Sequence, residues 1–320
     1  MHSIKKILIL YHRNIGDEAA LERALSLAHR VGGSVIVSEI MDPNDGRRLS
    51  WFLPPSPRSQ RALARARAER EAHFRRLLAS TERLNVTVRC KVLADGPAYE
   101  SVIKSVVKEN IDLVIATGAH MDLAKASARR SLVAKLVQGC PCPVWIADPD
   151  AAGGLRRLVA AVSLPENPED DREATRRILH LVAELHHIEQ CRVDILHAWD
   201  FTGAQRDRAR SDISREDLAD MVAGEAEARR ARIGALLSRA GLDGDQVEIH
   251  IERGPANFVI SEFVARNHVD LVVMGSGTRS NLKSLFAGNV AKEVCEDVPC
   301  SVLAVGQEPE SLPAPEHQLA

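Results

Sequence analysis

Short apolar runs alternate with longer amphipathic stretches along this chain. The first apolar run, residues 7–11, is only five residues long and rich in isoleucine and leucine, which is typical of a buried strand. Residues 18–31 carry leucines at helical spacing and stop at Gly32-Gly33, where glycine favours the end of a helix. The same criteria predict further strands at 34–41, 86–93, 112–117 and 144–147, and helices at 62–84, from Pro97 onward and around 131–137.

The second half of the chain repeats the first. Gly96-Pro97-Ala98 recurs as Gly254-Pro255-Ala256, a displacement of 158 residues. Asp112-Leu113-Val114 and Pro141-Cys142-Pro143-Val144 also find counterparts at that displacement, so the halves are duplicates. The strands predicted for the second half are 158–162, 193–198, 247–252, 271–274 and 302–305, and its helices lie near 172–187, 215–240, 255–267 and 290–296.

Strands that are apolar throughout and alternate with amphipathic helices predict parallel sheets that are covered on both faces. The sequence therefore predicts two tandem, doubly wound, five-stranded α/β domains of the Rossmann-like kind, at residues 1–150 and 151–308. The polar, proline-rich tail 309–320 is expected to be disordered. Ligands of such folds bind beyond the carboxyl ends of the strands.

The loop after the fourth strand of the second half carries the clearest binding signal. It reads Gly275-Ser276-Gly277-Thr278-Arg279, and Gly288-Asn289-Val290 later begins a helix. Glycine lets the backbone approach a phosphate, and the start of a helix offers free N–H groups to an anion. The pattern is neither a Walker loop nor a dinucleotide fingerprint, and glycines that serve only a tight turn are the alternative interpretation.

With this loop the chain resembles the universal stress protein family, over nearly all of both halves. Gly275 and Gly288 match the family's glycine pattern, whereas Thr278 stands where a second glycine is expected and Asn289 where a serine is expected. The family's aspartate after strand one resembles the Ser163 position here, and its adenine contact falls near Ala198. The resemblance implies an adenine nucleotide alpha hydrolase-like fold and an ATP-type ligand, with no metal beyond nucleotide-associated Mg²⁺. The candidate binding residues that the resemblance implies are Ser163, Ala198, Gly275, Ser276, Gly277, Thr278, Arg279, Gly288, Asn289 and Val290.

The first half departs further from the family pattern. Thr117, His120 and Arg130 stand at its glycine positions and His12 at its aspartate position, so we expect a degenerate site there. The overall layout resembles that of the tandem E-type members of the family. Members pair through their fifth strands, which implies an internal pseudo-dimer contact between 144–147 and 301–305.

The composition of the chain limits the classes of partner that we expect. A net charge of -2 and a pI near 6.6 give no electrostatic reason to expect nucleic acid. We expect no membrane insertion, because no stretch of about 18 apolar residues occurs. Six cysteines without a disulfide framework fit a reducing compartment, and we expect a cytoplasmic protein. The expected partner is a small molecule; a homodimer and protein partners stay open.

Weaker groupings each have a structural alternative. The set His186, His187, Cys191, His197 and His250 suggests zinc, but a structural or surface role is the preferred interpretation. Cys140-Pro141-Cys142 suggests a redox pair, although small buried hydrophobic residues explain it better, because Cys300 recurs at the Cys142 position. Ser163 and His197 both fall at strand ends, without an acid partner or an elbow motif for hydrolysis.

Two insertions, 42–59 and 200–214, follow the second strand of each half and are interpreted as lids or as ordered surface loops. The aromatic and apolar residues beside them suggest either an apolar tunnel for a lipid-like ligand or core packing; they are Trp51, Phe52, Leu53, Trp199 and Phe201. The sequence thus predicts a stress-response protein that binds a nucleotide or another phosphate-bearing ligand in its second domain, without catalysis. A ligand-independent interaction scaffold, a lipid binder and a slow ATPase are the alternatives.

Overall fold

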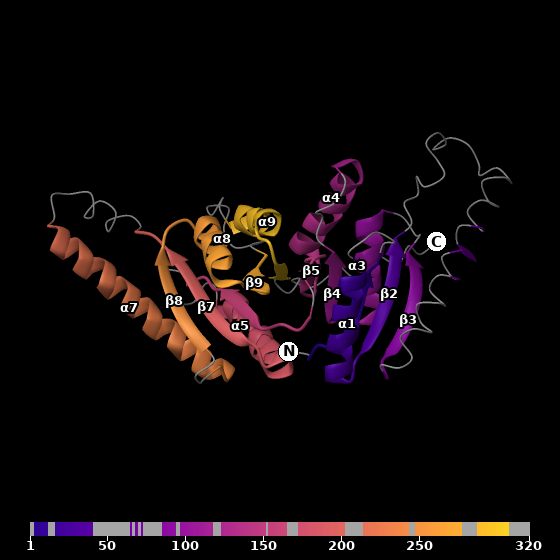
Figure 1. The fold of residues 1–320 in the computed structure, drawn as a ribbon, viewed down its shortest axis with the longest axis horizontal. Helices are drawn as coiled ribbons and strands as arrows, with labels where there is room; N and C mark the ends of the chain where they lie inside the picture. Colours follow the sequence, from indigo (N-terminus) through magenta and orange to yellow (C-terminus); the bar gives the residue numbers. More distant parts are fainter. Residues whose placement is uncertain are drawn as a thin grey trace, which may run out of the picture.

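The computed structural model describes most of both halves (Figure 1). The described residues are 3–11, 17–40, 65, 68–69, 72, 85–93, 97–117, 123–151, 153–164, 172–201, 214–242, 247–276 and 287–306; for 123–130, 172, 287–289, 292 and 296 only the backbone is described. Several expectations fall outside these residues: the insertion 42–59, most of the insertion 200–214, most of the helix at 62–84, the tail, His12, His120, Trp51, Phe52, Leu53, Gly277, Thr278 and Arg279.

Each half has the predicted order of elements. The first half contains β1 (Lys6–Leu10), α1 (Asp17–Val31), β2 (Ser34–Ile40), β3 (Thr87–Leu93), α3 (Ala98–Glu109), β4 (Leu113–Thr117), α4 (Leu123–Gly139) and β5 (Val144–Ala147). The second contains β6 (Arg157–Ala161), α5 (Arg172–Glu189), β7 (Arg192–Trp199), α7 (Arg215–Ala240), β8 (Val247–Arg253), α8 (Ala256–Asn267), β9 (Leu271–Gly275), α9 (Ala287–Asp297) and β10 (Ser301–Val305).

The strands form a single ten-stranded sheet in the order β3-β2-β1-β4-β5-β10-β9-β6-β7-β8. Pairing is parallel within each half and antiparallel only between β5 and β10, where Trp145 lies opposite Leu303. This seam confirms the predicted contact between the fifth strands, and Figure 1 shows one half on either side of it. The two doubly wound domains are therefore the halves of one continuous sheet.

Helices cover both faces of the sheet, as the apolar strands predict. One core cluster packs α1, α5 and α7 against the sheet, and a second packs α3, α4, α8 and α9 against the other face. Both clusters take residues from both halves, so each core runs across the seam. Central strands such as β4 and β10 are buried along their whole length, whereas most residues of the edge strands β3 and β8 are half-buried or exposed.

Local signals set the ends of the helices. The Ser214 hydroxyl accepts a hydrogen bond from the Asp217 amide at 3.0 Å and so caps the start of α7, and Gly241 ends that helix in the left-handed conformation at φ 70°. Within the described residues, no helix combines the length and the apolar character that crossing a bilayer requires.

Candidate ligand-binding site

The second half has a topological switch point between β6 and β9. From β6 the chain moves outward through β7 and β8, and it then returns to β9 on the opposite side of β6. In doubly wound sheets, ligands bind in the crevice beyond the carboxyl ends of the strands at such a point. The residues that follow β6 and β9 are therefore the first place to look for a site.

The strand register brings several predicted residues to this edge. Ala161 of β6 pairs with Leu196 of β7 on one side and with Met274 of β9 on the other. Two residues further along these three strands, and so at one level of the edge, come Ser163, Ala198 and Ser276. Ser163 is exposed and Ala198 is half-buried. The fold thus gathers residues that are far apart in the sequence.

Gly275 is the last residue of β9 and pairs with Val305 of β10. A Cβ added to Gly275 would meet Ile178 Cδ1 at 3.7 Å, which is an ordinary van der Waals distance. Packing therefore does not require glycine at this position.

Ser276 is buried, and its amide N–H donates a hydrogen bond to the carbonyl oxygen of Val305 at 3.0 Å. This backbone donor is already used within the sheet edge and is not available to a phosphate. The expectation that the Ser276 hydroxyl donates to a ligand stays a prediction.

The helix α9 starts on the same edge, because a helix that follows a parallel strand begins near that strand's carboxyl end. Gly288 and Asn289 lie in its first turn, where backbone N–H groups have no partner inside the helix. The side chain of Val290 is half-buried and packs on the core, so Val290 offers its backbone rather than its side chain. The described part of the predicted site thus contains one helix N-terminus and two serine side chains.

The side chain of His197 contacts the backbone at this edge of the sheet. Its Nδ1 lies 2.9 Å from the carbonyl oxygen of Val162, the residue before Ser163. Because a carbonyl can only accept, Nδ1 carries the proton, and Nε2 is an acceptor that has no partner among the described residues. Burial lowers the pKa of His197, and the charges of Arg229 and Arg232 lower it further, against the opposing effect of the Val162 bond.

This geometry disfavours hydrolase chemistry at Ser163. The described structure contains no hydrogen bond between Ser163 and His197, since the ring is turned to the Val162 carbonyl. The Ser163 carbonyl in turn accepts from the Thr175 hydroxyl at 3.0 Å, which ties the end of β6 to α5. His197 is accordingly a positioning residue for this turn.

Trp199 and Phe201, at the end of β7, are packed inside the protein. Both side chains are buried, and their rings meet edge to face with centroids 5.2 Å apart. Arg229 of α7 lies over Trp199 at 4.3 Å from the ring centroid, and Arg253 over Phe201 at 5.3 Å. Cation–π contacts and core packing therefore account for these two aromatic residues.

The matching position in the first half is filled. Thr117 ends β4 as Gly275 ends β9, and its buried hydroxyl donates to Oδ1 of Asp17, a buried residue at the start of α1. A side chain and a carboxylate thus occupy the edge where the second half has a glycine. This supports the expectation of a degenerate first site.

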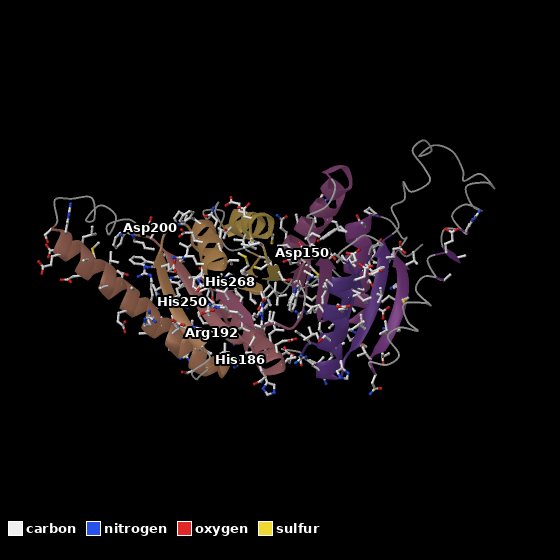
Figure 2. The ribbon with its side chains drawn as sticks, in the orientation of Figure 1. Asp150, His186, Arg192, Asp200, His250 and His268 are labelled. Carbon is white, nitrogen blue, oxygen red and sulfur yellow. The ribbon has the colours of Figure 1, made fainter. Side chains whose placement is uncertain are left out.

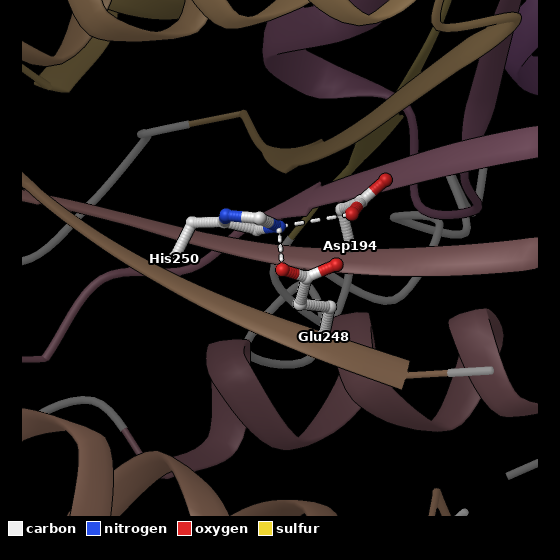
Figure 3. A group of neighbouring side chains, drawn as sticks. All are labelled: Asp194, Glu248 and His250. Atoms are coloured by element: carbon white, nitrogen blue, oxygen red, sulfur yellow. Dashed lines mark hydrogen bonds and ion pairs between the residues drawn. The ribbon is translucent and has the colours of Figure 1, made fainter. Parts of the chain in front are cut away.

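A buried ionic group was missed at the sequence level. It joins Asp194 of β7 to His250 of β8 and to Arg157 of β6, with Glu248 alongside. Figure 3 shows Asp194, His250 and Glu248 of this group. Arg157 Nε lies 2.6 Å from Asp194 Oδ2, and His250 Nε2 lies 2.9 Å from Asp194 Oδ1. The signal in the sequence was an aspartate inside an otherwise apolar strand, 193–196.

This group is an ion network and not a free metal centre. Burial raises the pKa of Asp194, but hydrogen bonds from His250 and Arg157 and their charges outweigh burial and hold that pKa below its ordinary value. Both oxygens of Asp194 already accept from Arg157, so a metal ion would have to displace a guanidinium. The group also lies away from the ligand edge, since Asp194 is near the start of β7, whereas Asp200 follows its far end (Figure 2).

The structure does not gather the histidines and cysteine that suggested zinc. His186 Nδ1 is 2.7 Å from the Cys191 carbonyl oxygen, His197 bonds Val162, and His250 bonds Asp194. His186 and His250 also lie at separate places in Figure 2. The preferred structural interpretation of these residues agrees with these contacts.

Comparison with known proteins places these features in a family. The family model described as the universal stress protein family matches twice, at residues 3–148 and 156–306. "Universal stress protein E" of Salmonella typhi is 23% identical over 309 residues, which is 95% of this chain and 95% of that protein. The Escherichia coli (strain K12) protein of the same name is 22% identical over 309 residues, with the same coverage.

Solved structures show the same fold over the whole chain. A putative universal stress protein from Pseudomonas aeruginosa matches with a TM-score of 0.66 and 18% identity, over 95% of this chain and 93% of that one. A universal stress protein from Archaeoglobus fulgidus matches with a TM-score of 0.64 and 13% identity, over 97% and 98%.

Proposed function

This chain belongs to the universal stress protein family, with one family domain in each half, and from this premise we propose that its second domain binds an ATP-type nucleotide or another phosphate-bearing ligand. The protein acts through that binding rather than through catalysis. The ligand lies beyond the carboxyl ends of β6 and β9, between Ser163 and the start of α9.

One observation carries the proposal: the two switch points differ at matched positions. In the first half Thr117 and Asp17 are hydrogen-bonded and buried at the edge. In the second half Gly275 stands in the place of Thr117, although the described residues around it leave room for a Cβ. Duplication gives both halves the same fold, so a glycine that packing does not need favours a role in binding.

The donors for an anion come mainly from α9. Gly288 and Asn289 lie in its first turn, and the free N–H groups and dipole of a helix start favour a phosphate. Ser163 adds an exposed hydroxyl group at the same edge. Because Ser163 stands where the family has an aspartate, the nucleotide loses a charge-assisted contact on its sugar side, and we expect weaker binding than in members that keep it.

Calorimetric titration of the full chain with Mg²⁺-ATP tests the proposal. Gly288→Asp places a carboxylate at the start of α9 and should weaken binding about tenfold or more, since about 1.4 kcal/mol corresponds to a factor of ten. Gly224→Asp is the matched control, because Gly224 is exposed in α7 and a Cβ there meets nothing within 4 Å.

Wild type and Gly224→Asp should bind alike. A wild type that shows no heat and no thermal shift with any nucleotide would remove the nucleotide and leave the ligand-independent scaffold. Phosphate release by the wild type above the level of Gly288→Asp would contradict binding without catalysis and indicate a slow ATPase.

A further inference from the structure

Two cysteine side chains meet in the turn between α4 and β5. Sγ of Cys140 lies 3.6 Å from Sγ of Cys142, and both residues are buried, at 4% and 8% exposure. Pro141 separates them, and all six cysteines of the chain are free thiols. A contact this short between two thiols is the arrangement from which a disulfide can close.

The seam places this pair beside the ligand edge of the other domain. In the antiparallel pairing of β5 with β10, Val144 lies opposite Ala304, so Cys142 lies level with Gly306. A Cβ added to Gly306 would come within 3.0 Å of the Cys140 carbonyl oxygen. Gly306 directly follows Val305, which accepts the Ser276 amide at the candidate site.

The contact makes the two sulfurs chemically different. The hydrogen bond between the two thiols lowers the pKa of Cys140, more than burial raises it. The same bond and burial raise the pKa of Cys142. Cys140 is therefore the sulfur that ionises, and the thiolate is the nucleophilic form of cysteine.

The pseudo-symmetric turn in the second domain has no such pair. Cys142 corresponds to Cys300, but Val298 stands where Cys140 would be. Burial raises the pKa of Cys300 to about 12, as expected for a small buried hydrophobic residue. The role of a small buried hydrophobic residue explains Cys300 and Cys142. It does not explain why a second sulfur, that of Cys140, is in contact with Cys142.

We propose that Cys140 and Cys142 form a redox-responsive dithiol that a hydroperoxide closes into a disulfide at the seam. The Cys140 sulfur attacks one peroxide oxygen, giving a sulfenic acid and releasing water. The Cys142 sulfur then attacks the Cys140 sulfur, and its proton leaves with the sulfenic hydroxyl as a second water. In total two thiols and one hydrogen peroxide become one disulfide and two waters, and the two electrons pass from sulfur to oxygen.

Closure must move the turn. The sulfurs have to approach from 3.6 Å to about 2.05 Å. On one side the Cys140 amide is held by the Leu136 carbonyl at 2.8 Å, and on the other the Pro143 carbonyl holds the Val114 amide at 3.0 Å. The movement therefore falls on the turn itself, which contacts Gly306. Disulfide formation does not depend on the proposed nucleotide binding and is tested separately.

The test is peptide mapping of the reduced full chain after hydrogen peroxide, with unreacted thiols alkylated under denaturing conditions. We expect the peptide holding Cys140 and Cys142 to lose two hydrogen atoms, to resist alkylation, and to regain both thiols with dithiothreitol. Cys142→Ser should abolish this product, whereas Cys300→Ser, the matched buried control, should keep it.

Peptide mapping of the wild type alone already decides the question if a variant fails to fold. Two intact thiols at Cys140 and Cys142 after peroxide would overturn the proposal. So would oxygen added to either sulfur without a bond between them, or a disulfide from one of them to another cysteine.

Discussion

Thr117 and Gly275 occupy the same place in the two halves of the sheet, each as the last residue of the fourth strand of its domain, and only Thr117 fills the edge beyond it. Its hydroxyl donates to Asp17, and both residues are buried. One duplicated fold thus carries a closed edge and an edge that ends in glycine, and this difference separates a structural domain from a candidate binding domain.

Gly275→Thr should transfer the closed edge to the second domain. We expect nucleotide binding to be lost in calorimetric titration with little loss of thermal stability, because an added Cβ meets Ile178 Cδ1 at the ordinary contact distance of 3.7 Å and no other atom of the described residues. Thr117→Gly is the reciprocal change: it removes the bond to Asp17 and should cost about 1–3 kcal/mol of unfolding free energy without altering nucleotide affinity. Wild-type affinity in Gly275→Thr would show that the ligand does not pass over this residue.

Asp194→Asn should destabilise the protein by about 3 kcal/mol at neutral pH, because it leaves Arg157 without its buried partner. The folded pKa of Asp194 is lowered, so its stabilising effect is complete above the ordinary aspartate pKa and is lost as pH falls through the folded value. The gap between wild type and variant should therefore close below about pH 4 in urea denaturation series.

Glu248→Gln provides the control for this prediction. Glu248 is half-exposed and pairs with Arg192 at the surface, so the cost should stay below about 1 kcal/mol. An equal loss of unfolding free energy in Asp194→Asn and Glu248→Gln would contradict the prediction that the buried ion pair of Asp194 stabilises the fold more than the surface pair of Glu248.

His197 should make stability depend on pH in a higher range. Its folded pKa is lowered, mainly by burial, so the unfolded chain binds a proton more readily than the folded one. Stability is therefore full above the ordinary histidine pKa of about 6.5 and declines as pH falls from there toward the folded value. In urea denaturation series from about pH 5 to about pH 8, His197→Gln should show a weaker decline in stability than wild type as the pH falls.

His187→Gln removes an exposed imidazole from α5 and serves as the control for His197→Gln. Its stability profile should run parallel to that of the wild type. If His197→Gln also runs parallel to the wild type, the buried ring does not exclude a proton as inferred.

The order of the described elements, their duplication and the covered parallel sheet could be predicted from the amino-acid sequence. Periodicity of two and of 3.6 residues reports burial directly, and a repeated motif at one displacement reports a repeated domain. The resemblance of the Gly275 loop and the pairing of the fifth strands pointed to the family and to the seam, and the seam is present between β5 and β10. These features depend on residues that are close in sequence or on a pattern that recurs.

Which polar groups already have hydrogen-bond partners, and which side chains meet, became visible in the three-dimensional fold. The Ser276 amide donates its hydrogen bond to the Val305 carbonyl oxygen, and Asp194 accepts hydrogen bonds from Arg157, which is 37 residues away in the sequence. Cys140 and Cys142 are close in sequence, but whether their sulfurs touch depends on the turn, and their place beside Gly306 depends on an antiparallel register across the seam. Strand order and register decide which residues of neighbouring strands lie side by side, and they leave no periodic signal in the sequence. A shift of one residue between two strands would change every pair of neighbours, while the hydrophobic pattern within each strand stayed the same.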